Sequence, residues 1–326
     1  MHKWIFSTKD TRKISSSKYT TFSAMATIQN FQQMTEHLTA LPNRFRIAVV
    51  CGSDESTLYA VERTLREGFA QIIFVGDTEK IQLCGALQPY ASLVSYVTAD
   101  GYADAAAKAV ALIRDGKADV LMKGLISTDI LLRAVLNKEN GLLPAGKVLT
   151  HLSVAQIPGR DQLLFFTDAA VIPYPTQEQR MAQVGYAIKL CHTFGIEEPR
   201  VSLLHCAEHV SEKFPHTMGY KEISERAAQG EWGRAIVDGP LDLRTSIDPA
   251  ALAHKGIESP LEGQADVLVF PDIEAGNVFY KTISFLTASD VAGTLQGTLC
   301  PVVLPSRGDS GKDKFYSMAF AAMAVE

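Results

Sequence analysis

The sequence predicts an α/β protein with two α/β/α domains, mostly parallel sheets and a cleft between the domains. Short runs rich in Val, Ile and Leu alternate with helical patterns from Arg46 onward. Strands of this kind are typical of parallel sheets that helices cover on both faces. A single sheet with so many strands would be unusual, and 326 residues are enough for two cores. We therefore expect two domains instead of one.

The first strands and helices form βαβ units. RIAVVC (46–51) predicts a buried strand. Residues 54–67 predict a helix, because acidic and hydroxyl residues open it and Gly68 stands where helices commonly end. QIIFVGD (71–77) predicts the next strand. Three further elements follow: a helix over 102–114, a strand over 118–124 and a helix over 128–137.

The second half repeats this alternation. Strands are predicted near KVLTHLSVAQI (147–157) and QLLFFTDAAVI (162–172). The later elements are a helix over 176–195, a strand over 200–206, a helix around 219–229, strands over 235–239 and 265–272, a helix over 276–289, a strand over 300–305 and a last helix from about Ser310. We place the first domain at 26–147 plus 298–326 and the second at 148–297. Residues 1–25 are expected to be a disordered leader or a start assigned too early.

The composition argues against several classes of protein. A net charge of −5 without a basic stripe argues against a nucleic-acid partner. No apolar run approaches the ~18 residues that a membrane span needs. The five cysteines are widely spaced and include no C-x-x-C pair. That usage is typical of reduced cytoplasmic thiols and not of disulfides or a zinc site.

Polar residues follow several predicted strands directly. They include Lys123-Gly124, Thr167-Asp168, DGP (238–240), PDIEAGN (271–277) and Ser306-Arg307-Gly308. Ligands of open parallel sheets bind beyond the carboxyl ends of the strands. Asp, Gly and Pro are also the residues that turns and helix caps need. The pattern alone is therefore compatible with a ligand cleft or with ordinary turns.

The stretch PVVLPSRGDSGKDK (301–314) is more specific. A strand that ends at Pro305 and a helix that starts near Ser310 bring helix N-terminal N–H groups close to Arg307. Such a place suits a phosphate, which the planar guanidinium can hold through two oxygens. The alternative is a solvated loop with an Arg307–Asp309 ion pair.

Five segments, in order over roughly residues 46–326, resemble the phosphate acyltransferase family, and its phosphate butyryltransferase branch more than its phosphate acetyltransferase branch. They are VLMKGLISTDILLRAVL (120–136), THLSVAQIPGRDQLLFFTDAAV (150–171), VDGPLDL (237–243), HKGIESPLEGQADVLVFPDIEAGNVFYK (254–281) and PVVLPSRGDSGKDKFYSMA (301–319). The most specific pieces are PDIEAGN and the Ser-Arg-x-Asp-Ser loop.

The resemblance implies that acyl-CoA and inorganic phosphate react to give acyl phosphate and free CoA. It implies no cofactor, no metal and no covalent enzyme intermediate, with CoA and phosphate as substrates. The fold it implies is related to that of isocitrate and isopropylmalate dehydrogenases. A cytoplasmic homodimer or higher homo-oligomer is the family expectation.

The resemblance also implies roles for individual residues. Ser306 and Arg307 would contact the reacting groups. Asp313, seven residues after the serine, would act as base toward the CoA thiol, with Asp309 as a second candidate. Arg133 would lie near the substrate, although an i, i+4 ion pair with Asp129 is an equal alternative. The remaining residues expected to bind substrate are Lys123, Gly124, Thr128, Asp272, Glu274, Gly276, Asn277 and Ser310.

Two departures from the family pattern concern acyl specificity. Arg244 stands where an acid is common, and Val171-Ile172-Pro173 lacks an expected asparagine. HCAEH (205–209) matches the H-x-x-E-H zinc pattern, but His205 ends an apolar strand instead of lying on a helix. Acetyl-CoA as substrate and a non-catalytic acyl-CoA-binding module are the alternatives to a butyryltransferase.

Overall fold

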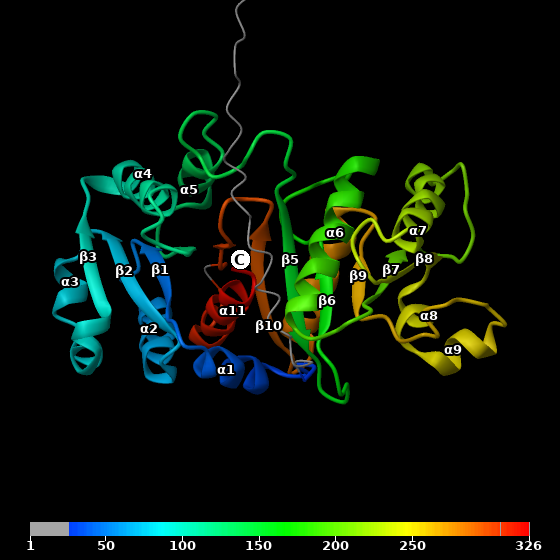
Figure 1. Cartoon of the computed structure of the whole chain (residues 1–326), viewed down its shortest axis with the longest axis horizontal. Coiled ribbons are helices and arrows are strands. Elements are labelled where there is room, and N and C mark those ends of the chain that lie inside the picture. Colours follow the sequence, from blue (N-terminus) through cyan, green and yellow to red (C-terminus); the bar gives the residue numbers. More distant parts are fainter. Residues whose placement is uncertain (1–25, 307, 326) are drawn as a thin grey trace, which may run out of the picture.

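Eleven strands of the described chain form one sheet, in the order β3-β2-β1-β4-β11-β10-β5-β6-β9-β7-β8 (Figure 1). The computed structural model describes residues 26–306 and 308–325, with the backbone only at residue 80. The strands are β1 Phe45–Val50, β2 Ala70–Gly76, β3 Val94–Thr98, β4 Val120–Lys123, β5 Thr150–Gln156, β6 Leu164–Thr167, β7 Arg200–Leu204, β8 Ile236–Leu241, β9 Val267–Val269, β10 Asp290–Gln296 and β11 Val302–Val303.

Helices cover both faces of this sheet. The α-helices are α1 Phe31–Ala40, α2 Glu55–Glu67, α3 Glu79–Gln82, α4 Gly101–Arg114, α5 Thr128–Val135, α6 Gln177–Thr193, α7 Tyr220–Ala228, α8 Leu243–Ile247, α9 Pro249–His254, α10 Ile273–Leu286 and α11 Gly311–Met323. Two 3₁₀ segments, Gly85–Leu93 and Pro215–Gly219, lie between them. No helix among the described residues is long and apolar enough to cross a membrane.

The α/β class and the mostly parallel sheet are confirmed. Strand β10 runs antiparallel to β5 and β11, and β5 runs antiparallel to β6, whereas the other neighbouring pairs are parallel. We had expected a separate sheet for each half of the chain. Instead, β10 and β5 pair and join the two halves into one sheet. The division of the chain into two domains stays a prediction.

Strand β10 was missed in the sequence because Gly293 interrupts its apolar pattern. The structure explains that glycine. A Cβ atom on Gly293 would lie 2.6 Å from Nε2 of His151 on the neighbouring strand β5. A contact that short would force the histidine ring to move, so the glycine allows the ring to lie against β10. Glycine in a strand often marks such a close approach.

Strand direction also changes where a site can form. Because β5 and β6 are antiparallel, the parallel strands β6, β9, β7 and β8 run opposite to β1, β2, β4 and β11. The carboxyl ends of the two halves therefore do not share one edge of the sheet. The loops after β6 and β11 nevertheless line one cavity, which contains Ala169, Ala170 and Val171 as well as Leu304, Pro305 and Ser306.

The apolar cores show where the space for a site lies. On one face, a single core extends from α1, α2 and α11 to α6 and α7, with Phe165 packed against Phe194 and Phe320 at 5.1 and 6.2 Å between ring centroids. On the other face the described residues form two cores, one under α4 and α5 and one under α8, α9 and α10. This face is therefore divided between α5 and α10.

Helix α11 fixes the loop that precedes it. Ser310 caps the helix in a capping box with Asp313. One turn later, Lys314 is only 5% exposed, and its ammonium donates to Asp54 at 2.9 Å and Ser56 at 2.7 Å near the start of α2. The predicted last helix is confirmed, and its first turns are anchored to the start of α2.

Candidate active site

A cavity of about 320 Å³ lies on the divided face, between α5 and α10, and we name it the cleft cavity. Its floor is formed by His151 on β5 and by Gly293 and Leu295 on β10. The other lining residues are Thr128, Leu132, Ala169, Ala170, Val171, Asn277, Tyr280, Lys281, Leu304, Pro305, Ser306, Asp309 and Ser317. One wall is largely apolar, and the end that Ser306 and Asp309 form is polar.

A second cavity of about 430 Å³, named the loop cavity, adjoins the first. The two cavities share Tyr280, Lys281, Ser306 and Asp309. The loop cavity is further lined by Ser284, Phe285, Ala288, Ser289, Asp290, Val291, Gly308, Ser310, Lys312 and Asp313. A ligand with two parts can therefore occupy both cavities and meet the shared residues in the middle.

The loop between β11 and α11 closes on itself through Ser306 and Asp309. The carboxylate of Asp309 accepts the backbone N–H of Ser306 at 2.8 Å, and the Asp309 N–H donates to the Ser306 carbonyl at 3.2 Å. The Ser306 hydroxyl accepts the Gly308 N–H at 3.4 Å. These bonds hold the serine hydroxyl and the aspartate carboxylate at the junction of the two cavities.

Asp309 and Asp313 differ in their surroundings. Burial raises the pKa of Asp309, and the negative charge of the Asp313 carboxylate raises it further. The hydrogen bond from the Ser306 N–H lowers this pKa, but the net shift is upward. Asp313 is occupied as the capping acceptor of the Ser310 hydroxyl at 2.7 Å and the Ser310 N–H at 3.1 Å. Asp309 also lines both cavities, whereas Asp313 lines only the loop cavity. The geometry thus favours Asp309 as a proton acceptor.

Asp168 builds the wall opposite the loop. Its side chain is only 2% exposed and accepts the Thr150 hydroxyl at 2.7 Å, the His151 N–H at 3.0 Å, and the N–H groups of Ala170 and Val171 at 2.8 and 2.9 Å. A buried carboxylate with this many donors is well satisfied. It holds the backbone of 169–171 rigidly along the cleft cavity.

His151, Tyr280 and Lys281 are site residues that the sequence analysis missed. Burial lowers the pKa of His151, whose Nδ1 lies 3.2 Å from the Ser153 hydroxyl, so its imidazole is neutral near pH 7. Burial, together with the nearby Asp309 and Asp313 carboxylates, raises the pKa of Tyr280. The phenol therefore keeps its proton and can donate it. The exposed Lys281 supplies a positive charge to both cavities.

Six of the predicted residues line the two cavities. These are Ser306, Asp309, Thr128, Asn277, Ser310 and Asp313. Asn277 is oriented by donating its amide N–H to the Ala169 carbonyl at 3.0 Å. Arg307 lies outside the described residues.

Other predicted residues have structural surroundings instead. Lys123 is buried, and its ammonium donates to the Pro305 carbonyl at 3.3 Å. Gly124 and Gly276 allow backbones to approach, since a Cβ atom would lie 2.4 Å from the Cys51 carbonyl oxygen and 2.1 Å from the Asp168 carbonyl oxygen, respectively. Asp272 caps α10 by accepting the Ala275 N–H at 2.8 Å.

Arg133 and Glu274 line neither cavity. Both side chains are exposed, on α5 and α10 respectively. In the HCAEH segment, Glu208 pairs with Lys255 at 2.7 Å. Within the part of the chain that the structure describes, no three His, Cys, Asp or Glu side chains are grouped so that they could hold a metal ion.

Comparison with known proteins places this site in a family context. The family model described as phosphate acetyl/butaryl transferase matches residues 91–322. The phosphate butyryltransferase of Clostridium acetobutylicum is 38% identical over 281 residues, which are 86% of this chain and 93% of that protein. A phosphate acetyltransferase of Rhizobium meliloti is 41% identical over 219 residues, which are 67% of this chain and 69% of that protein.

A solved structure of a related enzyme is also similar to this chain. The branched-chain phosphotransacylase from Enterococcus faecalis V583 superimposes with a TM-score of 0.76 at 33% identity, covering 86% of this chain and 99% of that chain. The family model spans both the α5 side and the 306–313 loop of the two cavities.

Proposed function

The chain belongs to the phosphate acetyl/butyryl transferase family and is a phosphate acyltransferase; from this premise we propose that its acyl substrate is butyryl-CoA or a short chain of similar size. The observation that carries the proposal is the cleft cavity of about 320 Å³, in which an apolar wall adjoins a polar end. We assign the acyl chain to that wall and the thioester carbonyl to the end formed by Ser306 and Asp309.

The apolar wall supports the proposal of an acyl chain longer than acetyl. Leu132, Val171, Leu295 and Leu304 line it from four different segments. Each methylene that a substrate buries there contributes about 0.8 kcal/mol. An acetyl group would leave much of this wall without a contact, whereas a butyryl or isobutyryl group would cover it.

The proposed reaction is a direct transfer. A phosphate oxygen attacks the thioester carbonyl carbon, the C–S bond breaks, and the sulfur leaves and is protonated to give free CoA. In the reverse direction a carboxylate removes the thiol proton before the sulfur attacks the acyl phosphate. We assign to the Ser306 hydroxyl the donation of a hydrogen bond to the oxyanion that forms on the carbonyl.

We assign the proton transfer to Asp309. A thiol of pKa ~8.5 and an ordinary aspartate of pKa ~3.9 are mismatched by roughly 4.6 units, or about 6 kcal/mol. The raised pKa of Asp309 reduces this mismatch from the carboxylate side. A cation beside the sulfur reduces it from the thiol side by stabilising the thiolate, and Lys281 lines the same cavities.

We further propose that Arg307 holds the phosphate. Its neighbours in the sequence, Ser306 and Gly308, line the loop cavity, which supports this assignment. A guanidinium binds two phosphate oxygens at once, which a lysine cannot do with the same geometry.

Acetyl transfer is the second candidate, because a phosphate acetyltransferase matches the chain at 41% identity. The experiment that decides is phosphate-dependent release of free CoA, followed with a thiol reagent, from acetyl-, propionyl-, butyryl- and isobutyryl-CoA in parallel. The proposal expects the largest kcat/KM for butyryl- or isobutyryl-CoA. A largest value for acetyl-CoA would overturn the acyl assignment, and no turnover with any of the four would overturn catalysis.

A further inference from the structure

His151, on the floor of the cleft cavity, has two ring nitrogens in different surroundings. Nδ1 lies 3.2 Å from the hydroxyl of Ser153 on the same strand, β5. Nε2 makes no hydrogen bond within the described part of the chain, and it is not one of the polar atoms that are buried there without a partner. Nε2 is therefore open to the cavity that His151 lines.

The position of this ring is fixed by the sheet. The backbone N–H of His151 donates to the Asp168 carboxylate at 3.0 Å, and its carbonyl accepts the Thr167 hydroxyl at 2.8 Å. Strand β5 pairs with β10 on one side and with β6 on the other. The ring lies over Gly293 of β10, where a Cβ atom would be 2.6 Å from Nε2. A group held in this way can meet a ligand without first being ordered.

The Ser153 hydroxyl determines which ring nitrogen carries the proton. Ser153 is buried, and Nδ1 of His151 is the one hydrogen-bond partner that its hydroxyl has among the described residues. A buried hydroxyl proton without an acceptor is costly, so the hydroxyl donates to Nδ1. In a neutral imidazole the proton is then on Nε2. Burial lowers the pKa of His151 and so favours this neutral form, although the nearby Asp168 carboxylate opposes the shift.

From these observations we infer that the Nε2–H of His151 donates a hydrogen bond to the carbonyl oxygen of the acyl group during transfer. The inference rests on the proposed acyl transfer in this cavity, to which it adds a second donor beside the Ser306 hydroxyl. His151 lies directly opposite Leu295 in the pairing of β5 with β10, and Leu295 is one of the residues to which we assign the acyl chain. The carbonyl of a chain packed against Leu295 therefore comes close to Nε2.

The chemistry of the transfer calls for such a donor. When a phosphate oxygen attacks the carbonyl carbon, an electron pair of the C=O bond moves onto the oxygen. The oxygen stays negative until the C=O bond re-forms and the C–S bond breaks. A neutral imidazole can donate to this oxygen without giving up its proton, so no other group has to restore it. A fixed donor of this kind stabilises the transition state more than the substrate.

The test measures phosphate-dependent release of CoA by variants of His151, with the acyl-CoA that gives the unmodified chain its largest kcat/KM. His151→Ala should lower kcat about 10²-fold or more, the loss typical of one oxyanion donor, and change the KM for phosphate little. His151→Gln has an amide N–H near the position of Nε2 and should recover at least tenfold of that loss. His151→Asn has its amide near the position of Nδ1 and should not.

The matched control for these variants is His192→Ala. His192 is on α6, donates from Nε2 to the Arg234 carbonyl at 3.0 Å, and lines neither the cleft cavity nor the loop cavity. Its loss should leave kcat unchanged. Circular dichroism checks that each variant is folded, and the comparison of His151→Gln with His151→Asn decides the question if His151→Ala does not fold.

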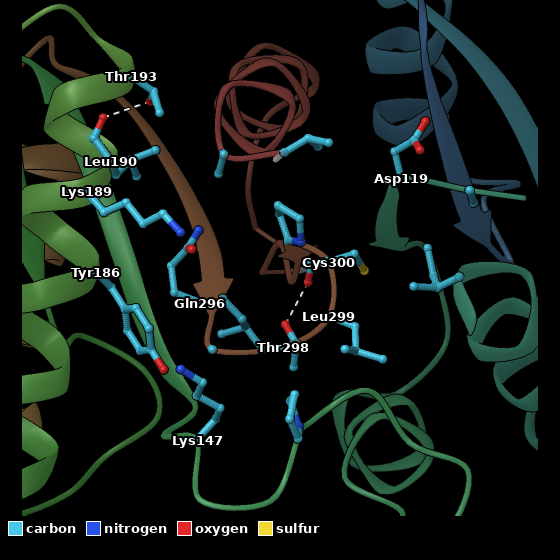
Figure 2. A pocket seen from close by; sticks show the side chains of 18 residues that line it. Asp119, Lys147, Tyr186, Lys189, Leu190, Thr193, Gln296, Thr298, Leu299 and Cys300 are labelled. Atoms are coloured by element: carbon cyan, nitrogen blue, oxygen red, sulfur yellow. Dashed lines mark hydrogen bonds between the residues drawn. The ribbon is translucent and has the colours of Figure 1, made fainter. Parts of the chain in front are cut away.

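A double-mutant cycle tests the role of Gly293 in positioning the ring. Gly293→Ala forces the ring to move, so kcat should fall about tenfold or more in the unmodified chain and little further in the His151→Ala chain. A glycine with a purely structural role would cause the same loss in both. The control on the same strand is Gln296→Leu, which should keep kcat. Gln296 lines a third cavity, of about 350 Å³, that shares only Leu295 with the cleft cavity (Figure 2).

Three results would overturn the inference in a protein that turns over. They are an unchanged kcat in folded His151→Ala, equal activities of His151→Gln and His151→Asn, and a loss that appears only as a higher KM for phosphate. The last result would assign the donor to phosphate instead of the carbonyl. Absence of turnover by the unmodified chain would overturn the proposed function itself, so the two failures are distinguishable.

Discussion

The carboxylate of Asp309 accepts the backbone N–H of Ser306 at 2.8 Å, and both residues line the cleft cavity and the loop cavity. This bond fixes a potential proton acceptor three residues from the serine hydroxyl. It also orients the serine, whose hydroxyl in turn accepts the Gly308 N–H at 3.4 Å. We propose that this pair is the centre of the acyl transfer.

Asp309→Asn should lower kcat for acyl transfer by about 10²–10⁴-fold, because the amide cannot exchange a proton with the CoA thiol. Asp313→Asn is the matched control on the same loop. It weakens a helix cap, at a cost of about 1 kcal/mol of stability, and should reduce kcat far less. Steady-state kinetics of the two purified variants compare them directly. A larger loss in the Asp313 variant would transfer the role of base to Asp313.

The same substitution should stabilise the protein at neutral pH. Since the pKa of Asp309 is raised by burial in the folded state, its contribution to stability is present below the unfolded pKa of ~3.9 and is lost as pH rises through the folded pKa. Asp309→Asn should therefore raise Tm at pH 7 and change it little at pH 4. The quantity to compare is the Tm of the variant minus the Tm of the unmodified chain. A lower value of this difference at pH 7 than at pH 4 would refute the expectation.

Arg307→Ala should reduce acyl transfer by two orders of magnitude or more while the protein stays folded, because the phosphate would lose the bidentate partner that we propose for it. Arg307→Lys keeps the charge and should recover only part of the activity. Circular dichroism checks the fold, and the KM for phosphate should rise in both variants. Unchanged activity in a folded Arg307→Ala protein would remove this residue from the mechanism.

Val171→Phe should change acyl preference. The residue lines the cleft cavity, and a larger side chain there occupies space that we assign to the acyl chain. We expect kcat/KM to fall about tenfold or more for butyryl-CoA and much less for acetyl-CoA, a discrimination typical of one or two methylenes. Equal losses for both substrates would mean that the acyl chain does not lie along this wall.

Lys314→Met should destabilise the protein by about 3–5 kcal/mol, because it leaves the Asp54 carboxylate near the start of α2 without its ammonium partner. Burial alone would raise the pKa of Asp54, but hydrogen bonds from Lys314 and neighbouring hydroxyls hold it below its ordinary value. The stabilisation is therefore present above the unfolded pKa and is lost as pH falls through the folded one. Urea unfolding at pH 7 measures the effect.

Lys312→Met is the control for that experiment. Lys312 is on the same helix and pairs with Asp290 at 2.7 Å, but its side chain is 47% exposed. Exposed pairs contribute at most about 1 kcal/mol. Similar losses of stability in the two variants would show that the burial of Lys314 does not strengthen its ion pair.

Much of the fold follows from local sequence. The helix over 54–67 was predicted because Gly68 could end it, and the structure places that glycine in the left-handed region with φ of 85°. The last helix was predicted from Ser310, which caps it. Local patterns of this kind depend on neighbouring residues, and they are visible without a structure.

The features that were missed depend on contacts between distant segments. Strand β10 has a glycine because the His151 ring of β5 occupies the space that a side chain would need. Tyr280 and Lys281 looked like ordinary residues of a helix, and they become site residues because α10 passes beside the 306–309 loop. For Gly276 and Asp272, which stay predicted substrate-binding residues, the structure adds a role in packing and in capping, respectively, that the sequence did not reveal.

The most direct test of the central claim is the stoichiometry of acyl phosphate and CoA formed from butyryl-CoA and phosphate. The acyl phosphate can be trapped with hydroxylamine and the free thiol titrated in the same sample. We expect equal amounts of both products and no CoA release when phosphate is omitted. Release of CoA without phosphate, or without an equal amount of acyl phosphate, would contradict direct transfer at the Ser306–Asp309 loop.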